Sequence, residues 1–403
     1  MADLGDARKL RAAPLRLFVL AGLCASLRGS WCALFFASGL RSPARSAAPR
    51  AGCGATGRRR LHVPLRAGAE TDVGRSAETA VGHIDLTTSW VEDFGDAEPA
   101  EILDFRVCAS CSKRPDNTQV VPACCPLYER PPLARMEKDR CSWVMSHRKM
   151  TKARVAATLA GCPSGFDAFD SSELVAQRRV LRKLLSFLAQ SEDFEGSILA
   201  EPGGRSAARY EINAEWLQIP GHEDARLALF GGYSGGPQGL PKTYGADFER
   251  LATGGKVSNR QHYQIVGYTL GSISLLVESE MDAMSKRGLS VELKTYGGDM
   301  ETFIAERAVD VFIQMVLGGS EFMALGLHLR GQLLAVRRLT AADLQRNVPP
   351  LKHWPALVGR LAALLHHIKQ TAHRHGVGVP LLITTEGKEM TIEPLTDCGD
   401  ARE

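Results

Sequence analysis

The chain has 403 residues, of which 44% are hydrophobic and 23% are charged, and its formal net charge at pH 7 is +4. This composition is typical of a globular protein and excludes a collagen, a mucin-like stalk and a wholly disordered chain. No apolar run reaches the roughly 18 to 20 residues that a membrane-spanning helix needs, which excludes a polytopic membrane protein. The length allows one large domain or two smaller ones.

The positive charge is concentrated at the N-terminus. Residues 1–70 contain twelve Arg and Lys but only three Asp and Glu, a net charge of +9, which leaves −5 for the remaining 333 residues. Four basic residues precede an apolar stretch at 17–27, and a segment rich in Ala, Arg, Ser and Gly follows it. This order is typical of a signal peptide followed by a transit peptide, so we expect 1–70 to be a targeting presequence, with a plastid as the favoured destination. A mitochondrial presequence and a disordered Arg-rich tail are the alternatives.

Residues 71–162 show little periodicity, and we expect this region to be poorly ordered. It contains the pair Cys108 and Cys111 and, further along, the adjacent pair Cys124 and Cys125. Four thiolates are a donor set for structural zinc, but zinc sites usually present their second pair as C-x₂-C. Reduced thiols are therefore the favoured interpretation, with a zinc site as the alternative.

Residues 163–397 show a mixed helix and strand pattern, and we expect them to form one compact domain. The first predicted helix has Ser171 and Ser172 as its N-terminal cap. Apolar periodicity predicts helices at residues 171–188, 244–252, 301–317 and 355–373. It predicts strands at residues 196–200, 208–212, 263–270, 274–282, 289–295, 322–329, 333–339 and 380–384.

The residues with the clearest chemistry lie between Glu280 and Lys294. Alternate residues of a strand share a face, so Glu280 is on the same face as Asp282, and Glu292 is on the same face as Lys294. The sequence at 286–288 is typical of a tight connection that folds the second strand back on the first. We therefore expect three carboxylates and one ammonium group to converge on one patch.

This patch suits metal-dependent hydrolysis of a phosphate ester. Carboxylate oxygens are hard ligands for Mg²⁺ or Mn²⁺, and two such ions can activate a water and stabilise the leaving oxygen. Lys294 would orient the water or neutralise charge at the phosphorus. The alternative is a polar strand face with cross-strand ion pairs. A second Glu-x-Lys sequence, Glu386-Gly-Lys388, follows a predicted strand, and we interpret it as a solvated hairpin turn.

The order acid-x-acid followed by Glu-x-Lys resembles the signature of the PD-(D/E)XK nucleases. This resemblance to the nucleases implies an α/β (α+β) fold in which a central mixed sheet is flanked by helices. Five ordered motifs between residues 178 and 339, with weaker similarity to about 397, also resemble the decapping exoribonuclease (DXO) family. They are an arginine before a K-L-L run (Arg178), a G-x-x-F-E helix (Glu249), an L-G-x-x-x-L-L strand running into E-x-D (Glu280, Asp282), a V-E-L-K-T strand (Glu292, Lys294) and a Q-x-x-L-G helix (Gln314).

The sequence also departs from the pattern of that family. Ser279 stands where the family has a glycine before E-x-D, and Thr269 stands where an arginine is expected before the L-G pair. Val311-Phe312 stands where the family has an aromatic pair, and Ala246-Asp247 stands where it has Tyr-Lys. Together these replacements leave the acidic residues intact but remove positive and aromatic groups that face RNA. The sequence therefore supports catalysis better than it supports any particular substrate.

The resemblance implies a metal-dependent enzyme that acts on RNA 5′ ends with two Mg²⁺ or Mn²⁺ ions. Such enzymes remove incomplete or NAD-type caps, release pyrophosphate from 5′-triphosphates and degrade RNA from 5′ to 3′. The metal ligands it implies are Glu249, Glu280, Asp282, Glu292 and the backbone carbonyl of Leu293. The catalytic residues it implies are Asp282, Glu292, Lys294 and Gln314. The residues that it implies for binding the substrate phosphates are Arg178, Lys294 and Gln314.

The resemblance also implies a partner 5′–3′ exonuclease, and a nuclear or cytoplasmic location if residues 1–70 are not a presequence. Two other functions are open at this point. One is an organellar nuclease of the same fold that acts on DNA, and the other is a non-catalytic relative that binds RNA or stabilises a partner. The retained acidic residues and Lys294 argue against the second, because a scaffold has no need of them.

Overall fold

The computed structural model describes residues 82–85, 97–113, 119–138, 152–189, 209–231, 243–255, 261–387 and 389–395. The predicted presequence and the predicted strand at 196–200 lie outside these residues. Within the described part of the chain, no helix is long and apolar enough to span a membrane.

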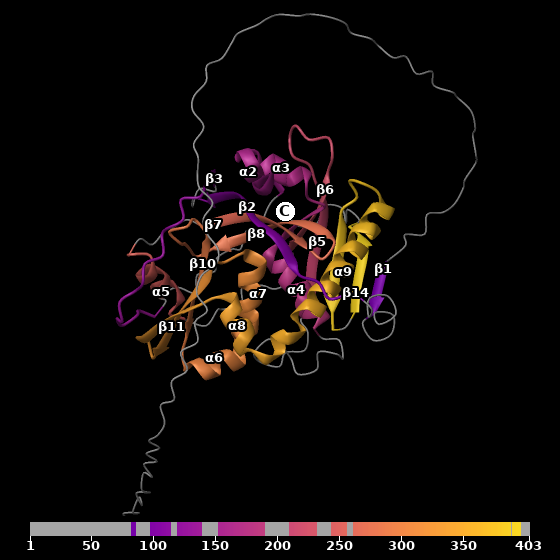
Figure 1. Cartoon of the computed structure of the whole chain (residues 1–403). Helices are drawn as coiled ribbons and strands as arrows, with labels where there is room; N and C mark the ends of the chain where they lie inside the picture. Colours follow the sequence, from indigo (N-terminus) through magenta and orange to yellow (C-terminus); the bar gives the residue numbers. More distant parts are fainter. Residues whose placement is uncertain are drawn as a thin grey trace, which may run out of the picture. The chain divides into compact units, whose positions relative to one another are not determined.

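A ten-stranded sheet forms the centre of the fold (Figure 1). Its strands are, in spatial order, β1 (Gly82–Asp85), β14 (Glu389–Pro394), β13 (Leu381–Glu386), β5 (Tyr210–Leu217), β6 (Arg226–Gly231), β4 (Leu174–Gln177), β8 (Ile273–Met281), β7 (Gln261–Leu270), β2 (Ile102–Lys113) and β3 (Gln119–Val120). Strand β4 runs parallel to its neighbours β6 and β8, whereas the other neighbouring strands of this sheet are antiparallel. The central sheet is therefore mixed, as the sequence predicted.

A second sheet continues from the end of β8. Its four strands are, in spatial order, β12 (Gln332–Leu339), β11 (Phe322–Leu329), β10 (Ser290–Tyr296) and β9 (Ala283–Met284). Strands β10 and β11 are parallel, and β9 pairs with β10 antiparallel. Because β8 ends at Met281 and β9 begins at Ala283, the chain passes from one sheet to the other at Asp282.

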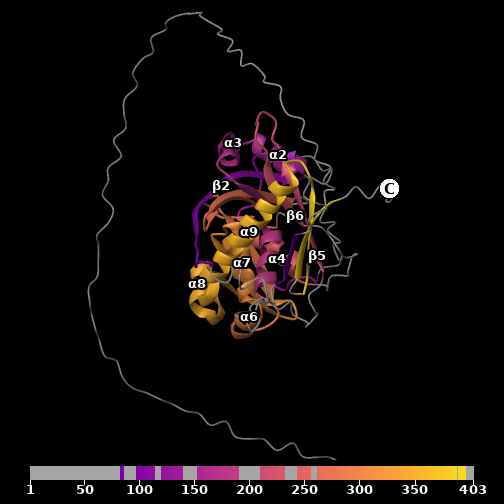
Figure 2. The same cartoon turned by 90° about the vertical axis from the view of Figure 1, so that its right-hand side faces the viewer.

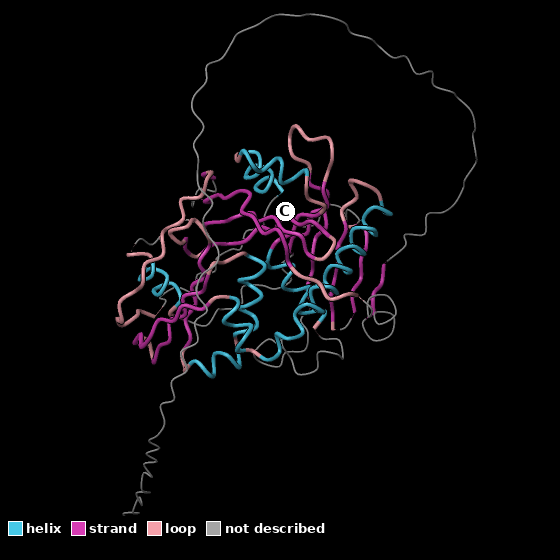
Figure 3. Tube along the Cα trace, viewed as in Figure 1, coloured by secondary structure: helices cyan, strands magenta, loops and turns pink. Residues whose placement is uncertain are grey.

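Helices cover both faces of the central sheet (Figures 2 and 3). The helices are α2 (Lys152–Ala160), α3 (Pro163–Asp170), α4 (Arg178–Leu188), α5 (Gly245–Ala252), α6 (Met300–Glu306), α7 (Ala308–Gly318), α8 (Ala341–Asn347), the 3-10 helix η2 (Pro349–His353) and α9 (Trp354–His375). One hydrophobic core lies between the sheet and α4, α7 and α9, and a second lies between the sheet and α2 and α3. Strand β8 contributes to both, since Leu275 and Val277 belong to the first core and Leu276 to the second.

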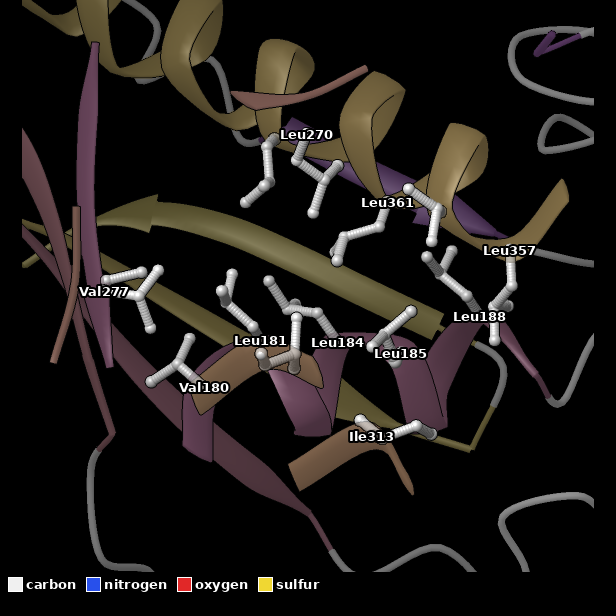
Figure 4. Packing of buried hydrophobic residues seen from close by; sticks show 14 of the residues in the cluster. Val180, Leu181, Leu184, Leu185, Leu188, Leu270, Val277, Ile313, Leu357 and Leu361 are labelled. Carbon is white, nitrogen blue, oxygen red and sulfur yellow. The ribbon is translucent and has the colours of Figure 1, made fainter. Parts of the chain in front are cut away.

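Helix α4 is at the centre of the first core. Its leucines recur at helical spacing, so one face of the helix is apolar and fully buried. Figure 4 shows this face against residues from α7, α9 and the central sheet. Burying one such side chain stabilises a fold by about 1.5–3 kcal/mol. The buried residues of α4 are Val180, Leu181, Leu184, Leu185, Phe187 and Leu188.

A third core lies under the second sheet, and it fixes which way the residues of β10 point. Val291 and Leu293 pack with Phe248 of α5. Since successive residues of a strand alternate between faces, Glu292 and Lys294 point to the opposite side of the sheet, away from α5. The packing of Phe248 therefore orients the two charged residues of β10.

Most of the predicted elements between residues 244 and 384 are confirmed to within a few residues. The predicted turn at Glu386-Gly-Lys388 is also confirmed as the connection of the β13–β14 hairpin, where Gly387 has a φ of +59°. The predicted helix at 301–317 is wrong in one respect, because it is divided at Arg307 into α6 and α7.

The predicted start of the helix at Ser171 is wrong. Residues 174–177 form the buried parallel strand β4, and helix α4 begins only at Arg178. The hydroxyls of Ser171 and Ser172 instead donate to carbonyls of the preceding helix α3, at 3.1 and 2.8 Å. A short apolar run next to a helical pattern is ambiguous in sequence, and here the sheet decides its conformation.

Strands β1, β2 and β3 and helix α2 lie in the region 71–162, for which the sequence predicted little order. Strand β2 pairs with β7 along most of its length, and α2 packs on α3 and β2. The central sheet therefore includes residues that precede the expected start of the compact domain at 163.

Candidate active site

Asp282 lies at the bend between the two sheets. The connection after β9 is a tight turn in which Gly288 has a φ of +78° and donates its amide to the carbonyl of Ser285 at 3.0 Å. The turn folds β10 back on β9, so the backbone amide of Leu293 donates to Oδ2 of Asp282 at 2.8 Å. The predicted hairpin thus forms between β9 and β10, and the bend at Asp282 separates it from β8.

Lys294 joins the acidic residues of the bend and of β10. Its Nζ atom donates to Oε1 of Glu292 and also lies 3.4 Å from Oδ2 of Asp282. The side chain of Glu292 is only 2% exposed, whereas that of Lys294 is 32% exposed. The sequence prediction that these residues converge is therefore realised in the structure as an ammonium group between two carboxylates.

Arg178 binds the other oxygen of Glu292. Its Nη1 atom donates to Oε2 of Glu292 at 3.0 Å and to the backbone carbonyl of Gln314 at 3.3 Å. Arg178 reaches this point because it is the first residue of α4, directly after β4, which runs parallel to β8. Gly318, in the last turn of α7, lies so close that an added Cβ would be 2.9 Å from the Arg178 guanidinium.

The charges of this cluster shift the pKa values of its acids in opposite directions. Burial opposes ionisation of Glu292, but the adjacent charges of Lys294 and Arg178 outweigh burial and lower its pKa to about 2. Burial raises the pKa of Glu280 to about 7, and the neighbouring carboxylate of Asp282 adds to the effect. Burial likewise raises the pKa of Asp282. Burial thus dominates at Glu280 and Asp282, whereas the adjacent cations dominate at Glu292.

The donor types of this cluster fit a divalent cation. Mg²⁺ and Mn²⁺ prefer carboxylate oxygens, and the raised pKa of Glu280 marks a place where added positive charge is favourable. As the side chains stand, however, no three His, Cys, Asp or Glu residues in the described part of the chain are arranged to hold a metal ion. Both oxygens of Glu292 are engaged by Lys294 and Arg178.

The other predicted site residues lie on α5, β10 and α7. Glu249 is exposed on α5, a helix that packs against β10, and its role as a metal ligand stays a prediction. The amide of Leu293 binds Asp282, and the role of its carbonyl as a ligand also stays a prediction. The side chain of Gln314 does not join the cluster in this arrangement, because its Nε2 atom donates to Oδ2 of Asp310 at 2.8 Å.

Two features near the cluster were missed by sequence reasoning. Arg154 of α2 forms a buried pair with Glu278 of β8, with Nη2 at 3.0 Å from Oε1 and 3.1 Å from Oε2. Tyr263 of β7 is the direct cross-strand partner of Glu280. The sequence could have indicated Glu278, because it lies two residues before Glu280 in the same strand and therefore shares its face. The partners of these glutamates come from distant segments and could not be inferred.

The four cysteines considered for zinc do not assemble into a site. Cys108, Cys111 and Cys125 are buried, Cys124 is exposed, and all four are free thiols. Burial raises the pKa of the Cys108 and Cys111 thiols, and it raises that of Cys125 to about 12. Among the described residues no set of three cysteine, histidine or acidic side chains is disposed to bind a metal.

The fold is that of the Rai1 proteins. The chain superposes on S. pombe Rai1 in complex with 3′-FADP with a TM-score of 0.58 and 14% identity, over 79% of this chain and 100% of that one. Candida albicans Rai1 in complex with pU5 and Mn²⁺ gives a TM-score of 0.57 and 11% identity, over 79% and 93%. Scheffersomyces stipitis Rai1 in complex with 3′-NADP⁺ and a calcium ion gives 0.55 and 13%, over 80% and 94%. No family model matches the sequence, and no curated protein matches it significantly. At these identities the likeness establishes the fold, and the chemistry has to be argued from the site.

Proposed function

We propose that this protein is a metal-dependent hydrolase that acts at RNA 5′ ends. The observation that carries the proposal is the convergence of Asp282, Glu292 and Lys294, with Glu280 adjacent, at the junction of the two sheets of a Rai1-like fold. Solved Rai1 structures contain pU5 with Mn²⁺, 3′-NADP⁺ with a calcium ion, or 3′-FADP. These ligands support a nucleotide substrate and a divalent cation.

Glu280, Asp282 and Glu292 would hold one or two Mg²⁺ or Mn²⁺ ions, with the Leu293 carbonyl and Glu249 as further ligands. The ions would supply an activated water and charge neutralisation at the phosphate. Asp282 is oriented for this role by the Leu293 amide, which fixes its Oδ2 atom. Glu292 is oriented by Arg178, which leaves Oε1 as its more accessible oxygen once Lys294 moves.

The cationic residues would act on the substrate. Lys294 lies close to the carboxylates, so its ammonium group could donate a hydrogen bond to the attacked phosphate or to the attacking water. The backbone carbonyl of Gln314 accepts from Arg178, and its side-chain amide would have to leave Asp310 to bind a substrate phosphate. Further positive charge comes from Arg179, Arg182 and Lys183 in the first two turns of α4. These residues would attract the RNA 5′ phosphates to an otherwise acidic protein.

The test is hydrolysis by the full chain of RNAs that carry a 5′-triphosphate, a 5′-monophosphate, an NAD cap or an incomplete cap, in the presence of Mn²⁺. The Asp282→Asn, Glu292→Gln double variant is the control, because it keeps the shapes of both side chains. We expect product from at least one RNA with the wild type, and loss of that product with the double variant or with EDTA. Equal hydrolysis by the wild type and the double variant would contradict the metal-site assignment.

The same assay separates the alternatives. Hydrolysis of DNA but not of RNA would identify an organellar DNA nuclease of this fold. Binding of RNA without hydrolysis would identify a non-catalytic relative, and co-purification with a 5′–3′ exonuclease would then indicate its partner.

The proposed location is an organelle, with a plastid favoured. It rests on the basic composition of residues 1–70, and the mitochondrion, nucleus and cytoplasm are the alternatives. A fluorescent protein fused after residue 70 is expected to enter an organelle, and to lose that localisation when the presequence is removed.

A further inference from the structure

Both oxygens of Glu292 are engaged by cations of the protein. Lys294 binds Oε1, and Arg178 binds Oε2 at 3.0 Å. Lys294 also reaches Asp282, with 3.4 Å between Nζ and Oδ2. Its ammonium group therefore lies between two of the carboxylates that the proposed function assigns to a divalent cation.

The two cations are held differently. Arg178 is 15% exposed, and its guanidinium also donates to the Gln314 carbonyl at 3.3 Å, so two elements of the fold fix its position. Lys294 is 32% exposed, and the acceptors that bind its ammonium are the carboxylates of Asp282 and Glu292. A lysine ammonium is a compact charge on a flexible stem, whereas a guanidinium in two hydrogen bonds is a rigid fork. Lys294 is therefore the cation that can leave Glu292.

We propose that Lys294 is an internal counter-ion of the carboxylate cluster, which competes with a divalent cation for Glu292 and Asp282. The inference rests on the proposed function, because it concerns the metal ligands named there. Glu280, Asp282 and Glu292 carry a formal charge of −3 when ionised, and Lys294 and Arg178 offset two of these charges. Displacing Lys294 exposes Glu292 to the metal and frees an ammonium group beside the place where a phosphate would bind.

Direct measurement of Mn²⁺ binding tests the inference without any RNA. The full chain is titrated with Mn²⁺, and the free ion is followed by its electron paramagnetic resonance signal. The variants are Lys294→Met, which keeps the length of the side chain but not its charge, and Lys294→Gln, which keeps a hydrogen-bond donor for Glu292. The matched control is Lys286→Met, since Lys286 is an exposed lysine in the turn of the same hairpin.

We expect both Lys294 variants to bind Mn²⁺ with a Kd at least about tenfold lower than that of the wild type, because one positive charge has been removed from beside the ligands. Lys286→Met is expected to change the Kd by less than about threefold, since an exposed charge is screened by solvent and salt. The Asp282→Asn substitution, added to Lys294→Met, is expected to reverse the gain. Near-ultraviolet circular dichroism establishes whether each variant is folded. If Lys294→Met is not folded, the Kd of Lys294→Gln is used to test the inference.

The outcomes distinguish this inference from the proposed function. If folded Lys294 variants bind Mn²⁺ no more tightly than the wild type, the inference is overturned, while binding by the wild type still supports a metal-dependent enzyme. If neither the wild type nor any variant binds Mn²⁺, the carboxylates are not a metal site, and both the inference and the metal dependence are overturned. If only the Lys294 variants bind Mn²⁺, the competition is confirmed in its strongest form.

Discussion

Nη1 of Arg178 donates to Oε2 of Glu292 across 3.0 Å, although the two residues are 114 positions apart in the sequence. The bond joins the first residue of α4, on the central sheet, to β10 of the second sheet. Since Arg178 also binds the Gln314 carbonyl, one side chain connects a helix, a strand and the end of a second helix. It thereby fixes the position of the most buried acid of the candidate site.

Replacing Arg178 is therefore expected to cost stability. In Arg178→Met the buried carboxylate of Glu292 keeps Lys294 but loses its second cation and a hydrogen bond between charged groups, which is expected to cost about 1.5–3 kcal/mol. The control is Arg182→Met on the same helix, whose partner Asp310 is 42% exposed and lies 3.5 Å away, and it should cost about 1 kcal/mol or less. Urea unfolding of both variants measures the difference. Equal losses would show that the Arg178 pair does not stabilise the junction.

The buried pair of Arg154 and Glu278 gives a second test of stability. Their side chains are 9% and 6% exposed, so Arg154→Met leaves a buried carboxylate without its cation and is expected to cost about 3–5 kcal/mol. The double variant Arg154→Met, Glu278→Leu removes both charges and is expected to recover most of that loss. Thermal and urea unfolding of the two single variants and the double variant complete the cycle. A double variant that is as unstable as the sum of the single variants would contradict this account.

Gly319, directly after α7, should tolerate no side chain. Its φ is +64°, and a Cβ built there would lie 1.6 Å from the ring of Phe105. Gly387 has a similar φ of +59°, but no atom lies within 4 Å of the corresponding position. Gly387→Ala is expected to cost only the backbone strain of about 1–2 kcal/mol, and Gly319→Ala clearly more, because Phe105 must move as well. Unfolding midpoints that fall equally in both variants would be inconsistent with the close contact.

His328 should make the stability depend on pH. Burial lowers the pKa of this histidine, which packs edge-on against Tyr244 at a ring-centroid distance of 4.8 Å. The unfolded chain therefore binds a proton more readily than the folded chain, and stability is present above pH 6.5 and is lost as the pH falls below that value. His328→Phe keeps the aromatic contact and should lose less stability between pH 7.5 and pH 5.5, roughly the range around a histidine pKa. His353→Phe, at an exposed histidine, is the control and is expected to behave as the wild type does.

Gln314 should affect activity more than stability, if the proposed function holds. Its amide is bonded to the half-exposed Asp310, so Gln314→Ala is expected to cost about 1 kcal/mol or less. Loss of one hydrogen-bond donor to the reacting phosphate is expected to lower RNA hydrolysis by about a hundredfold. Asp310→Ala removes the partner of Gln314 in the resting structure but leaves the amide in place, so it should retain most of the activity. A similar loss in both variants would indicate that the helix, rather than the amide, is needed.

The local pattern of the sequence determined most of the strands and helices of this protein and part of its candidate site. Short, largely apolar runs predicted β7, β8, β10 and β11, and a longer amphipathic run predicted α9, because these patterns depend on neighbours within a few residues. The alternation of side chains along a strand put Glu292 and Lys294 on one face, and the sequence at 286–288 predicted a turn that brings Asp282 to them. The sequence thus supplied the mixed fold class and the central part of the candidate site.

Tertiary structure decided the rest, because it depends on contacts between distant segments. The sequence could not place residues 174–177 in the sheet, since a short apolar run is compatible with either a helix or a buried strand until its neighbours are known. The resemblance implied that Arg178 binds a substrate phosphate, and this stays a prediction, but the bond of its guanidinium to Glu292 could not be inferred from the sequence. The contacts of Lys294 with Glu292 and Asp282, from which we infer competition with a metal ion, likewise depend on how β8, β10 and α4 meet, because ion pairing is set by distance in space rather than by spacing along the chain.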